Sequence, residues 1–321
     1  MIVRIIRRSK RSRWTFEEHG IMKPAPFKYV AVGTVEEAVA VKADYGDDAR
    51  FLAGGQSLMP ALNFRLAQPE VLIDINAVAG GDEVGVCDGH LHVGALTRYR
   101  ALQRSAAVAR HAPLIGEALP HIAHPQIRNR GTIGGNLSHA DPASELPAIM
   151  LAMGARMRMR SVTGERCVDA RSFFVGALCT ALDSSEMLVG IELPMPGPRS
   201  GTSFMEIARR RGDFAIMGIA AQVTLAEDGG CDDVRLAYCG AGDGPVLASA
   251  AAAALRGSRG GDDDIAAAAA LAAREVDPSG SIHASQEYQR HLAGVLTRRA
   301  LKIALERAKT APVVEDKGET R

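Results

Sequence analysis

Two glycine pairs contain the residues of this chain whose types and spacing could do chemistry. The first pair lies in FLAGGQSLMP at residues 51–60, and the second lies in RNRGTIGGNLSHADPASELP at residues 128–147. Converging backbone N–H groups hold a diphosphate well because they are fixed dipoles, and glycine lets the main chain approach a ligand closely. The side chains that could add donors are Gln56, Ser57, Thr132 and Asn136. Two such loops suggest one ligand with two ends, although either pair alone is equally compatible with a tight turn.

The known phosphate-binding signatures do not match either pair. Neither follows G-x-G-x-x-G with a downstream acid or G-x-x-x-x-G-K-[ST], which disfavours a Rossmann unit and a P-loop and favours another kind of dinucleotide site. Ser138, His139 and Asp141 lie within one loop without a nucleophile elbow, which disfavours a hydrolase. His121 and His124 have no evident third ligand, so we predict hydrogen bonding there and no metal site.

Composition and cysteine spacing restrict the class of protein further. With 321 residues and a net charge of +1, two or three domains are expected and no broad nucleic-acid-binding surface is indicated. The five cysteines form no C-x-x-C, so no zinc ribbon or iron–sulfur cluster is encoded by spacing. No apolar run reaches the roughly 20 residues of a transmembrane helix, and we predict a cytoplasmic protein. Residues 1–21 are basic and lack periodicity, which predicts a disordered extension.

The elements that must position the first loop form a compact unit. We expect a helix over residues 34–46 capped by Thr34, a strand over 49–55, a short helix from Ser57 and a buried strand over 70–75.

A second group of elements should position the second loop. Strands are expected at residues 90–95, 155–161 and 186–194. Helices are expected at 97–105, which Thr97 could cap, at 112–123, where Pro120 should end or kink the helix, and at 142–155 from Pro142. Proline and glycine in residues 194–201 predict a domain boundary, after which three antiparallel strands and three helices indicate an α+β domain.

A short basic run follows this boundary at Arg209, Arg210 and Arg211. It fits either a solvated strand edge or turn, or a contact with acidic groups of a partner subunit or with a nicotinamide phosphate.

Four segments together resemble a known family. They are RFLAGGQSLMPALNFRLAQPEVLIDI, AHPQIRNRGTIGGNLSHADPASELP, SEMLVGIELP and FMEIARRRGDFAIMGIAA. The chain is similar over roughly residues 22–300 to the FAD-binding medium subunit of molybdenum hydroxylases, which include aerobic carbon monoxide dehydrogenases and bacterial xanthine dehydrogenases. The resemblance implies an α+β protein with a two-subdomain PCMH-type FAD-binding fold and a C-terminal domain of a three-stranded antiparallel sheet with helices. The implied limits are 1–21 for the extension, 22–80 and 81–197 for the subdomains, 198–310 for the C-terminal domain and 311–321 for a tail.

The resemblance also implies which residues contact FAD. Its first FAD segment falls on Arg50, Phe51, Leu52, Ala53, Gly54, Gly55, Gln56 and Ser57, and its second on Thr132, Ile133, Gly134, Gly135 and Asn136. Glu145 is implied as the acid at the adenosine ribose, with Asp141 close by. Backbone contacts are implied at Leu188 or Val189, a further contact at Ile122, and ring packing at Phe214. Glu206 stands where some relatives have lysine, which leaves the polar partner of the flavin ring open.

The implied function is electron transfer. Electrons would pass from a molybdenum cofactor in a large subunit, through two [2Fe–2S] clusters in a small subunit, to noncovalently held FAD in this chain and then to NAD, a quinone or oxygen. A dimer of heterotrimers is expected, with substrate chosen by the large subunit. No residue of this chain is assigned a catalytic or metal-binding role, because the redox chemistry belongs to the cofactor. The alternatives are a stand-alone flavin reductase of the same broad fold and a non-catalytic nucleotide-binding assembly subunit.

Overall fold

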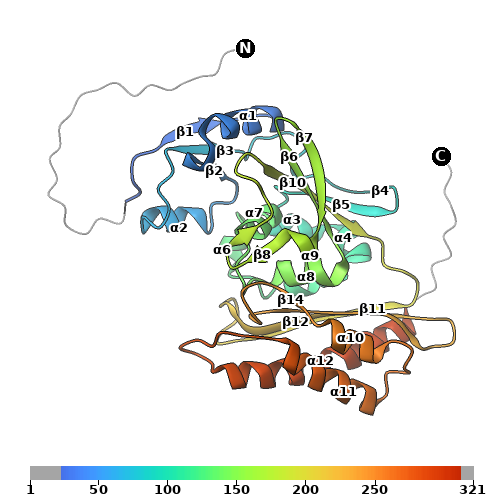
Figure 1. The fold of residues 1–321 in the computed structure, drawn as a ribbon. Helices are drawn as coiled ribbons and strands as arrows, with labels where there is room; N and C mark the ends of the chain where they lie inside the picture. Colours follow the sequence, from blue (N-terminus) through green and yellow to red (C-terminus); the bar gives the residue numbers. More distant parts are fainter. Residues whose placement is uncertain (1–22, 312–321) are drawn as a thin grey trace, which may run out of the picture.

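The computed structural model describes residues 23–311 and arranges them around three main β-sheets that follow one another along the chain (Figure 1). The extension expected at residues 1–21 and nearly all of the expected tail lie outside these residues. The mixture of sheets and helices confirms the predicted α+β class, and each sheet forms the centre of one structural unit.

The N-terminal unit is a three-stranded parallel sheet with the order β1-β3-β2. Its elements are β1 (Lys28–Ala31), α1 (Val35–Tyr45), η1 (Gly46–Asp48), β2 (Ala49–Leu52), α2 (Leu58–Asn63) and β3 (Val71–Asp74). The Thr34 hydroxyl accepts a hydrogen bond from the N–H of Glu37 at 3.1 Å, which confirms the predicted helix cap. The first glycine pair follows β2 directly, so this sheet sets its position.

The middle unit contains a five-stranded antiparallel sheet with the order β4-β5-β10-β6-β7. Its strands are β4 (Val84–Cys87), β5 (His90–Gly94), β6 (Arg156–Ser161), β7 (Gly164–Asp169) and β10 (Met187–Pro194), and a small hairpin pairs β8 (Phe174–Gly176) with β9 (Cys179–Thr180). Its helices are α3 (Tyr99–Arg104), α4 (Ala106–His111), α5 (Pro113–Ala118), α6 (Pro125–Arg128), α7 (Ile133–His139), α8 (Glu145–Met153) and α9 (Ala170–Phe173).

Two predicted helix starts in this unit are wrong by a few residues. Thr97 does not cap α3, because its hydroxyl donates to the carbonyl of Gly94 at 2.7 Å and Arg98 is the N-cap residue. Helix α8 begins at Glu145 and not at Pro142, because the Asp141 side chain accepts from the N–H of Ala143 and forms a turn there.

The C-terminal unit is a four-stranded antiparallel sheet with three helices on one face. Its elements are β11 (Ser200–Ala208), β12 (Ala215–Leu225), β13 (Cys231–Cys239), β14 (Val246–Leu247), α10 (Ser249–Leu255), α11 (Asp262–Glu275) and α12 (Gln286–Thr310). The three predicted strands and three predicted helices are confirmed, and the two-residue β14 is an addition that is too short to leave a sequence pattern. Although α12 has 25 residues, no helix within residues 23–311 combines the length and apolarity needed to cross a membrane.

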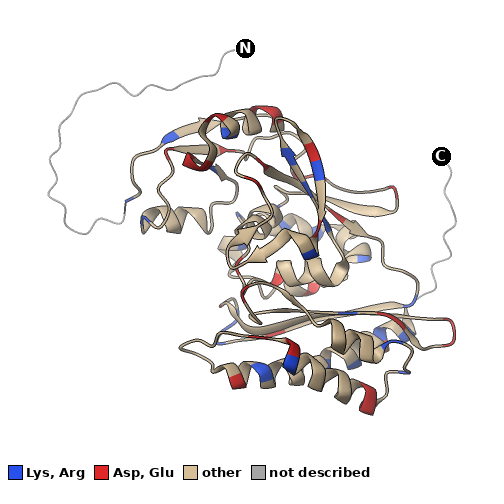
Figure 2. Ribbon diagram, in the orientation of Figure 1, with Lys and Arg blue, Asp and Glu red and all other residues tan. Residues whose placement is uncertain are grey.

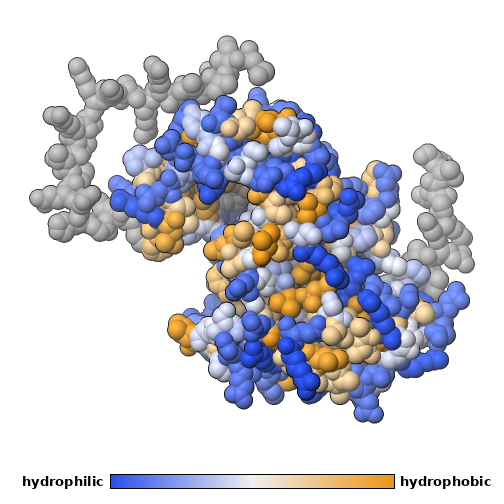
Figure 3. Space-filling model, viewed as in Figure 1, coloured by the Kyte–Doolittle hydropathy of each residue, from blue (hydrophilic) through white to orange (hydrophobic). Residues whose placement is uncertain are grey.

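Helix α8 lies where the middle and C-terminal units meet. All nine of its residues are buried, and it contacts β12 and β13 on the sheet face opposite to α10–α12. The Glu117 carboxylate of α5 reinforces this junction by accepting from the N–H of Phe204, from the Thr202 hydroxyl and from Arg307 of α12. Figure 2 shows charges of both signs along β6, β7, α11 and α12, and Figure 3 shows apolar residues gathered between the upper and lower parts of the visible face.

The contact between β11 and α12 leaves no room for a side chain at Gly201. A Cβ atom there would overlap the carbonyl oxygen of Ala304 and the backbone nitrogen of Ala308. We predict that Gly201→Ala lowers the free energy of unfolding by about 1–3 kcal/mol, since backbone atoms must move. Gly85→Ala in β4 is the matched control, because its Cβ would meet no atom within 4 Å. Urea unfolding of both variants tests this, and equal stabilities would contradict the packing argument.

Candidate cofactor-binding site

The first glycine loop lines a cleft of about 420 Å³ beside the ends of β2 and β3. Within residues 23–311, no acceptor engages the N–H groups of Gly54, Gly55 or Gln56. The Gln56 side chain instead donates to the carbonyl of Gly54 at 2.9 Å, which stabilises the turn. Gly55 has φ of +71°, a conformation that favours glycine. The loop therefore presents a row of free backbone donors to the cleft, which suits an anionic group.

The two predicted loops touch one another through their backbones. A Cβ atom on Gly54 would lie 2.5 Å from the carbonyl oxygen of Arg130 and 2.9 Å from the Cα of Gly131. A Cβ atom on Gly135 would lie 3.9 Å from the Cβ of Ala53. The structure thus brings both glycine pairs to one place, as a shared ligand requires.

The second glycine pair differs from the first because it forms the first turn of α7. The N–H of Ile133 donates to Thr97, the N–H of Gly134 donates to Ala95, and the N–H of Gly135 donates to the Thr132 hydroxyl at 3.1 Å. These donors are already occupied, so this segment contributes close approach rather than a set of free N–H groups. Gly134 in particular allows contact with Ala95, whose Cβ would lie 2.5 Å from an added Cβ.

Asn136, which was expected to donate to a ligand, is paired within the protein. Its side-chain amide donates to the Ser144 hydroxyl at 2.7 Å, and that hydroxyl donates back to the Asn136 oxygen at 2.9 Å. Buried Tyr99 lies beside it, and burial raises the pKa of the Tyr99 phenol despite a hydrogen bond with Asn136. This pairing fixes α7 against the start of α8.

A polar network that sequence reasoning missed joins the two walls of the cleft. The Asn76 amide donates to the carbonyls of Leu52 at 3.2 Å and Ala53 at 3.0 Å. The Arg98 guanidinium donates to the Asn76 side chain and to the carbonyl of Arg130. The sequence contains only weak indications of this network, since Asn76 merely follows a predicted strand and Arg130 merely lies inside the second motif. Arg130 also lines the cleft and supplies a positive charge there.

Asp74 belongs to the same network and also lines the cleft. Burial pushes its pKa upward, but hydrogen bonds from Tyr29 and Asn76 outweigh burial and leave the pKa of Asp74 below its usual value. An ionised Asp74 therefore orients Asn76 toward the loop.

The remaining predicted residues are distributed around this centre. Val189 lines a second cleft of about 300 Å³. Its carbonyl accepts a hydrogen bond from the N–H of Ala95, and the carbonyl of Ala95 accepts one from the N–H of Gly134. Ile122 and Leu188 are buried, whereas Phe214 is 69% exposed in the turn between β11 and β12. Arg50, Phe51 and Leu52 belong to β2, whereas Ser57 is the N-cap residue of α2 without a side-chain cap bond.

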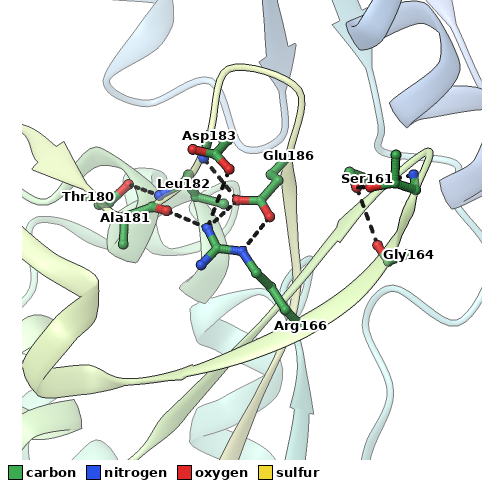
Figure 4. Close-up of polar contacts among 9 residues, drawn as sticks. Ser161, Gly164, Arg166, Thr180, Ala181, Leu182, Asp183 and Glu186 are labelled. Carbon is green, nitrogen blue, oxygen red and sulfur yellow. Dashed lines mark hydrogen bonds and ion pairs between the residues drawn. The ribbon is translucent and has the colours of Figure 1, made fainter.

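An ion pair holds the segment that leads into β10 (Figure 4). Arg166 donates to both carboxylate oxygens of Glu186, at 2.6 and 2.7 Å, and to the carbonyl of Ala181 at 2.8 Å. The hydrogen bond from Arg166 lowers the pKa of Glu186, which is buried but ionised. This ion pair fixes the backbone directly before β10, and with it the positions of Leu188 and Val189 at the start of the strand.

Glu145 lies in a different electrostatic environment from Glu186. It is 5% exposed, and burial, followed by the nearby Glu206, raises its pKa to about 8. Glu145 is therefore mainly a neutral acid at neutral pH. Its predicted contact with an adenosine ribose stays a prediction, since the structure places it near Glu206 and Cys239.

Comparison with known proteins identifies two family regions in the chain. Residues 25–196 match the FAD binding domain in molybdopterin dehydrogenase, and residues 202–304 match the CO dehydrogenase flavoprotein C-terminal domain. These matches confirm the predicted resemblance. They also confirm the FAD-binding class that the open donors of the first loop, the cleft and Arg130 of the second motif support.

Relatives with high coverage support the same assignment. The chain is 41% identical to the 6-hydroxypseudooxynicotine dehydrogenase complex subunit alpha of Paenarthrobacter nicotinovorans, over 90% of this chain and 97% of that one. It is 40% identical to the caffeine dehydrogenase subunit beta of a Pseudomonas species, over 89% and 97%. A carbon monoxide dehydrogenase structure from Hydrogenophaga pseudoflava matches with a TM-score of 0.86 and 36% identity, over 88% and 99%.

Gly54 provides a direct test of the cleft. We predict that Gly54→Ala weakens FAD binding about tenfold or more, because its methyl group must push the loop away from Arg130. Gly33→Ala is the control, since its Cβ would approach only the Glu37 carboxylate, at 3.9 Å. Titration of the FAD-free chain by flavin fluorescence measures both affinities. Equal affinities would show that this backbone contact does not shape the site.

The raised pKa of Glu145 predicts a pH-dependent stability. Because the folded chain binds this proton more tightly than the unfolded chain, the contribution of Glu145 is complete below the unfolded value of 4.5 and is lost as pH rises through about 8. The thermal midpoint of the FAD-free chain should therefore fall between about pH 5 and pH 8 more steeply than that of Glu145→Gln. Parallel curves for the two proteins would contradict this.

Proposed function

We propose an electron-transfer role for this chain, which belongs to the family that carries the FAD-binding domain of molybdopterin dehydrogenases. In the proposed complex, electrons leave a molybdenum cofactor in a large subunit and pass through [2Fe–2S] clusters in a small subunit to FAD in this chain. The FAD then passes them to NAD, a quinone or oxygen. Relatives that are named as subunits of dehydrogenase complexes support this role.

The observation that carries the proposal is the row of N–H groups in the cleft next to Arg130 that have no acceptor among the residues the structure describes. Gly54, Gly55 and Gln56 would hold the diphosphate of FAD, and the Arg130 guanidinium would offset its charge. Gly135 would let the ligand lie close to α7, and the Ser57 and Thr132 hydroxyls would border it. Bound FAD supplies the capacity to accept and release electrons, whereas this chain binds and orients it.

The outer contacts of FAD are proposed from the family pattern. We assign the adenosine end to Asp141 and Glu145, and the backbone contacts to Leu188 and Val189. Ile122 and Phe214 are proposed to border the ring system. Residues 22–80 and 81–197 would be the two FAD-binding subdomains, followed by a C-terminal domain over 198–310.

Partners are proposed from the family resemblance, and the compartment from the cysteines. A small [2Fe–2S] subunit and a large molybdenum subunit would complete the complex as a dimer of heterotrimers. All five cysteines are free in the structure, and their spacing provides no cluster motif, so iron–sulfur centres would belong to another chain. Free thiols are also consistent with a reducing cytoplasm.

Co-purification tests the proposal. We predict that the complex contains molybdenum, iron and FAD in fixed ratios, measured by metal and flavin analysis. The flavin absorbance should bleach with a reductant and recover with an acceptor. A chain that stays colourless after incubation with FAD would overturn the proposal. Flavin that turns over without bound molybdenum or iron would favour the stand-alone reductase, and bound nucleotide without redox change would favour the assembly subunit.

A further inference from the structure

A row of three residues crosses the C-terminal sheet on the face that packs against α8. Glu206 of β11 is paired with Gly218 of β12, and Gly218 is paired with Cys239 of β13. A Cβ atom on Gly218 would lie 2.6 Å from the Cys239 sulfur and 3.4 Å from the Glu206 Cβ. The glycine therefore leaves the space in which the Glu206 side chain is buried.

The Glu206 carboxylate is buried with one oxygen unused. Its side chain is 3% exposed, and Oε2 has no hydrogen-bond partner within the described residues. Oε1 lies 3.7 Å from Nδ1 of His121, whose side chain is 38% exposed and packs edge-on against Phe204. A buried carboxylate oxygen without a donor is costly, which indicates that a proton or a donor belongs there.

Glu145 lies in the first turn of α8, which packs on the same sheet face, and is also buried. The chain just before this turn is bonded to the sheet, because the N–H of Gly240, next to Cys239, donates to the carbonyl of Pro142. Among residues 23–311, neither Glu145 nor Glu206 has a Lys or Arg nitrogen within 4 Å. The other titratable groups around the two carboxyls are Tyr99 of α3, His121 after α5, Asp141 before α8 and Cys239 of β13. Two buried carboxylates without a strong cation do not both ionise readily.

We propose that Glu145 and Glu206 share one proton at neutral pH and form a proton-binding site beside the FAD cleft. The site is linked to the cleft through α7, because Ser144 at the start of α8 is bonded to Asn136, and a Cβ atom on the adjacent Gly135 would lie 3.9 Å from Ala53 in the cleft wall. Negative charge that arrives on FAD favours uptake of a second proton by the remaining carboxylate, which forms one O–H bond while one O–H bond of a solvent hydronium ion breaks and leaves water. The coupling of proton uptake to charge on FAD rests on the proposed function.

Infrared titration of the FAD-free chain tests the shared proton without the cofactor. The protonated-carboxyl band should disappear as pH rises through about 8. In Glu206→Gln the band should disappear at lower pH, because Glu145 loses a like charge, and in Glu145→Gln the titration near this pH should be absent. Glu186→Gln is the matched control, since Glu186 is a buried carboxylate already ionised by Arg166. An unchanged titration in both test variants would overturn the proposal.

The pH dependence of the flavin reduction potential tests the coupling in the FAD-loaded chain. The potential should fall more steeply with pH in the wild type than in Glu206→Gln. Glu275→Gln is the control here and should keep the wild-type slope, because the Glu275 carboxylate accepts from the N–H groups of Ala250 and Ala251 on the sheet face opposite to α8. Equal slopes in wild type and Glu206→Gln would overturn the coupling. A chain that binds no FAD would instead defeat the proposed function, and the infrared titration would still decide whether the two carboxyls share a proton.

Discussion

The burial of α8 on all sides is the constraint on which the rest of the structure depends. Because α8 lies between two sheets, none of its sides is exposed to water, and most of the side chains that pack against it are small or apolar. Ser144 is the N-cap residue of this helix without a side-chain cap bond, and its hydroxyl exchanges hydrogen bonds with Asn136, which fixes α7 against α8. The position of the cleft beside the first glycine loop therefore depends on the packing of α8 in the core, although no residue of α8 lines that cleft.

The same constraint explains why two acids of similar sequence context differ so much in charge. Glu186 is buried just before β10, where Arg166 of β7 donates to both of its carboxylate oxygens. Glu145 opens the central helix, where neither the sheet below nor the helices beside it supply such a partner among the described residues. Burial disfavours the charged form of both carboxyls, but the hydrogen bonds from Arg166 outweigh burial at Glu186, whereas no guanidinium among the described residues does so at Glu145.

The sequence was sufficient for the elements with strong periodicity or clear caps. The unit around the first loop and the three long strands of the C-terminal sheet left such patterns. Helix α7 left no such pattern, because two glycines in a first turn predict a loop. Only the structure shows that Gly134 is needed there for close packing against Ala95. The partners Asn76 and Arg98 are separated by 22 residues, and the pair Glu145 and Glu206 by 61, so only the tertiary structure brings them together.

The bridge from Arg98 to Asn76 and Arg130 has a consequence for the assembly of the protein. This bridge joins both walls of the cleft using only atoms of the chain, so the cleft keeps its width before any nucleotide arrives. The ordering entropy of the walls is lost during folding and is not a cost of ligand capture. The folded polypeptide is therefore a preorganised receptor, whose walls a ligand would not have to order on binding.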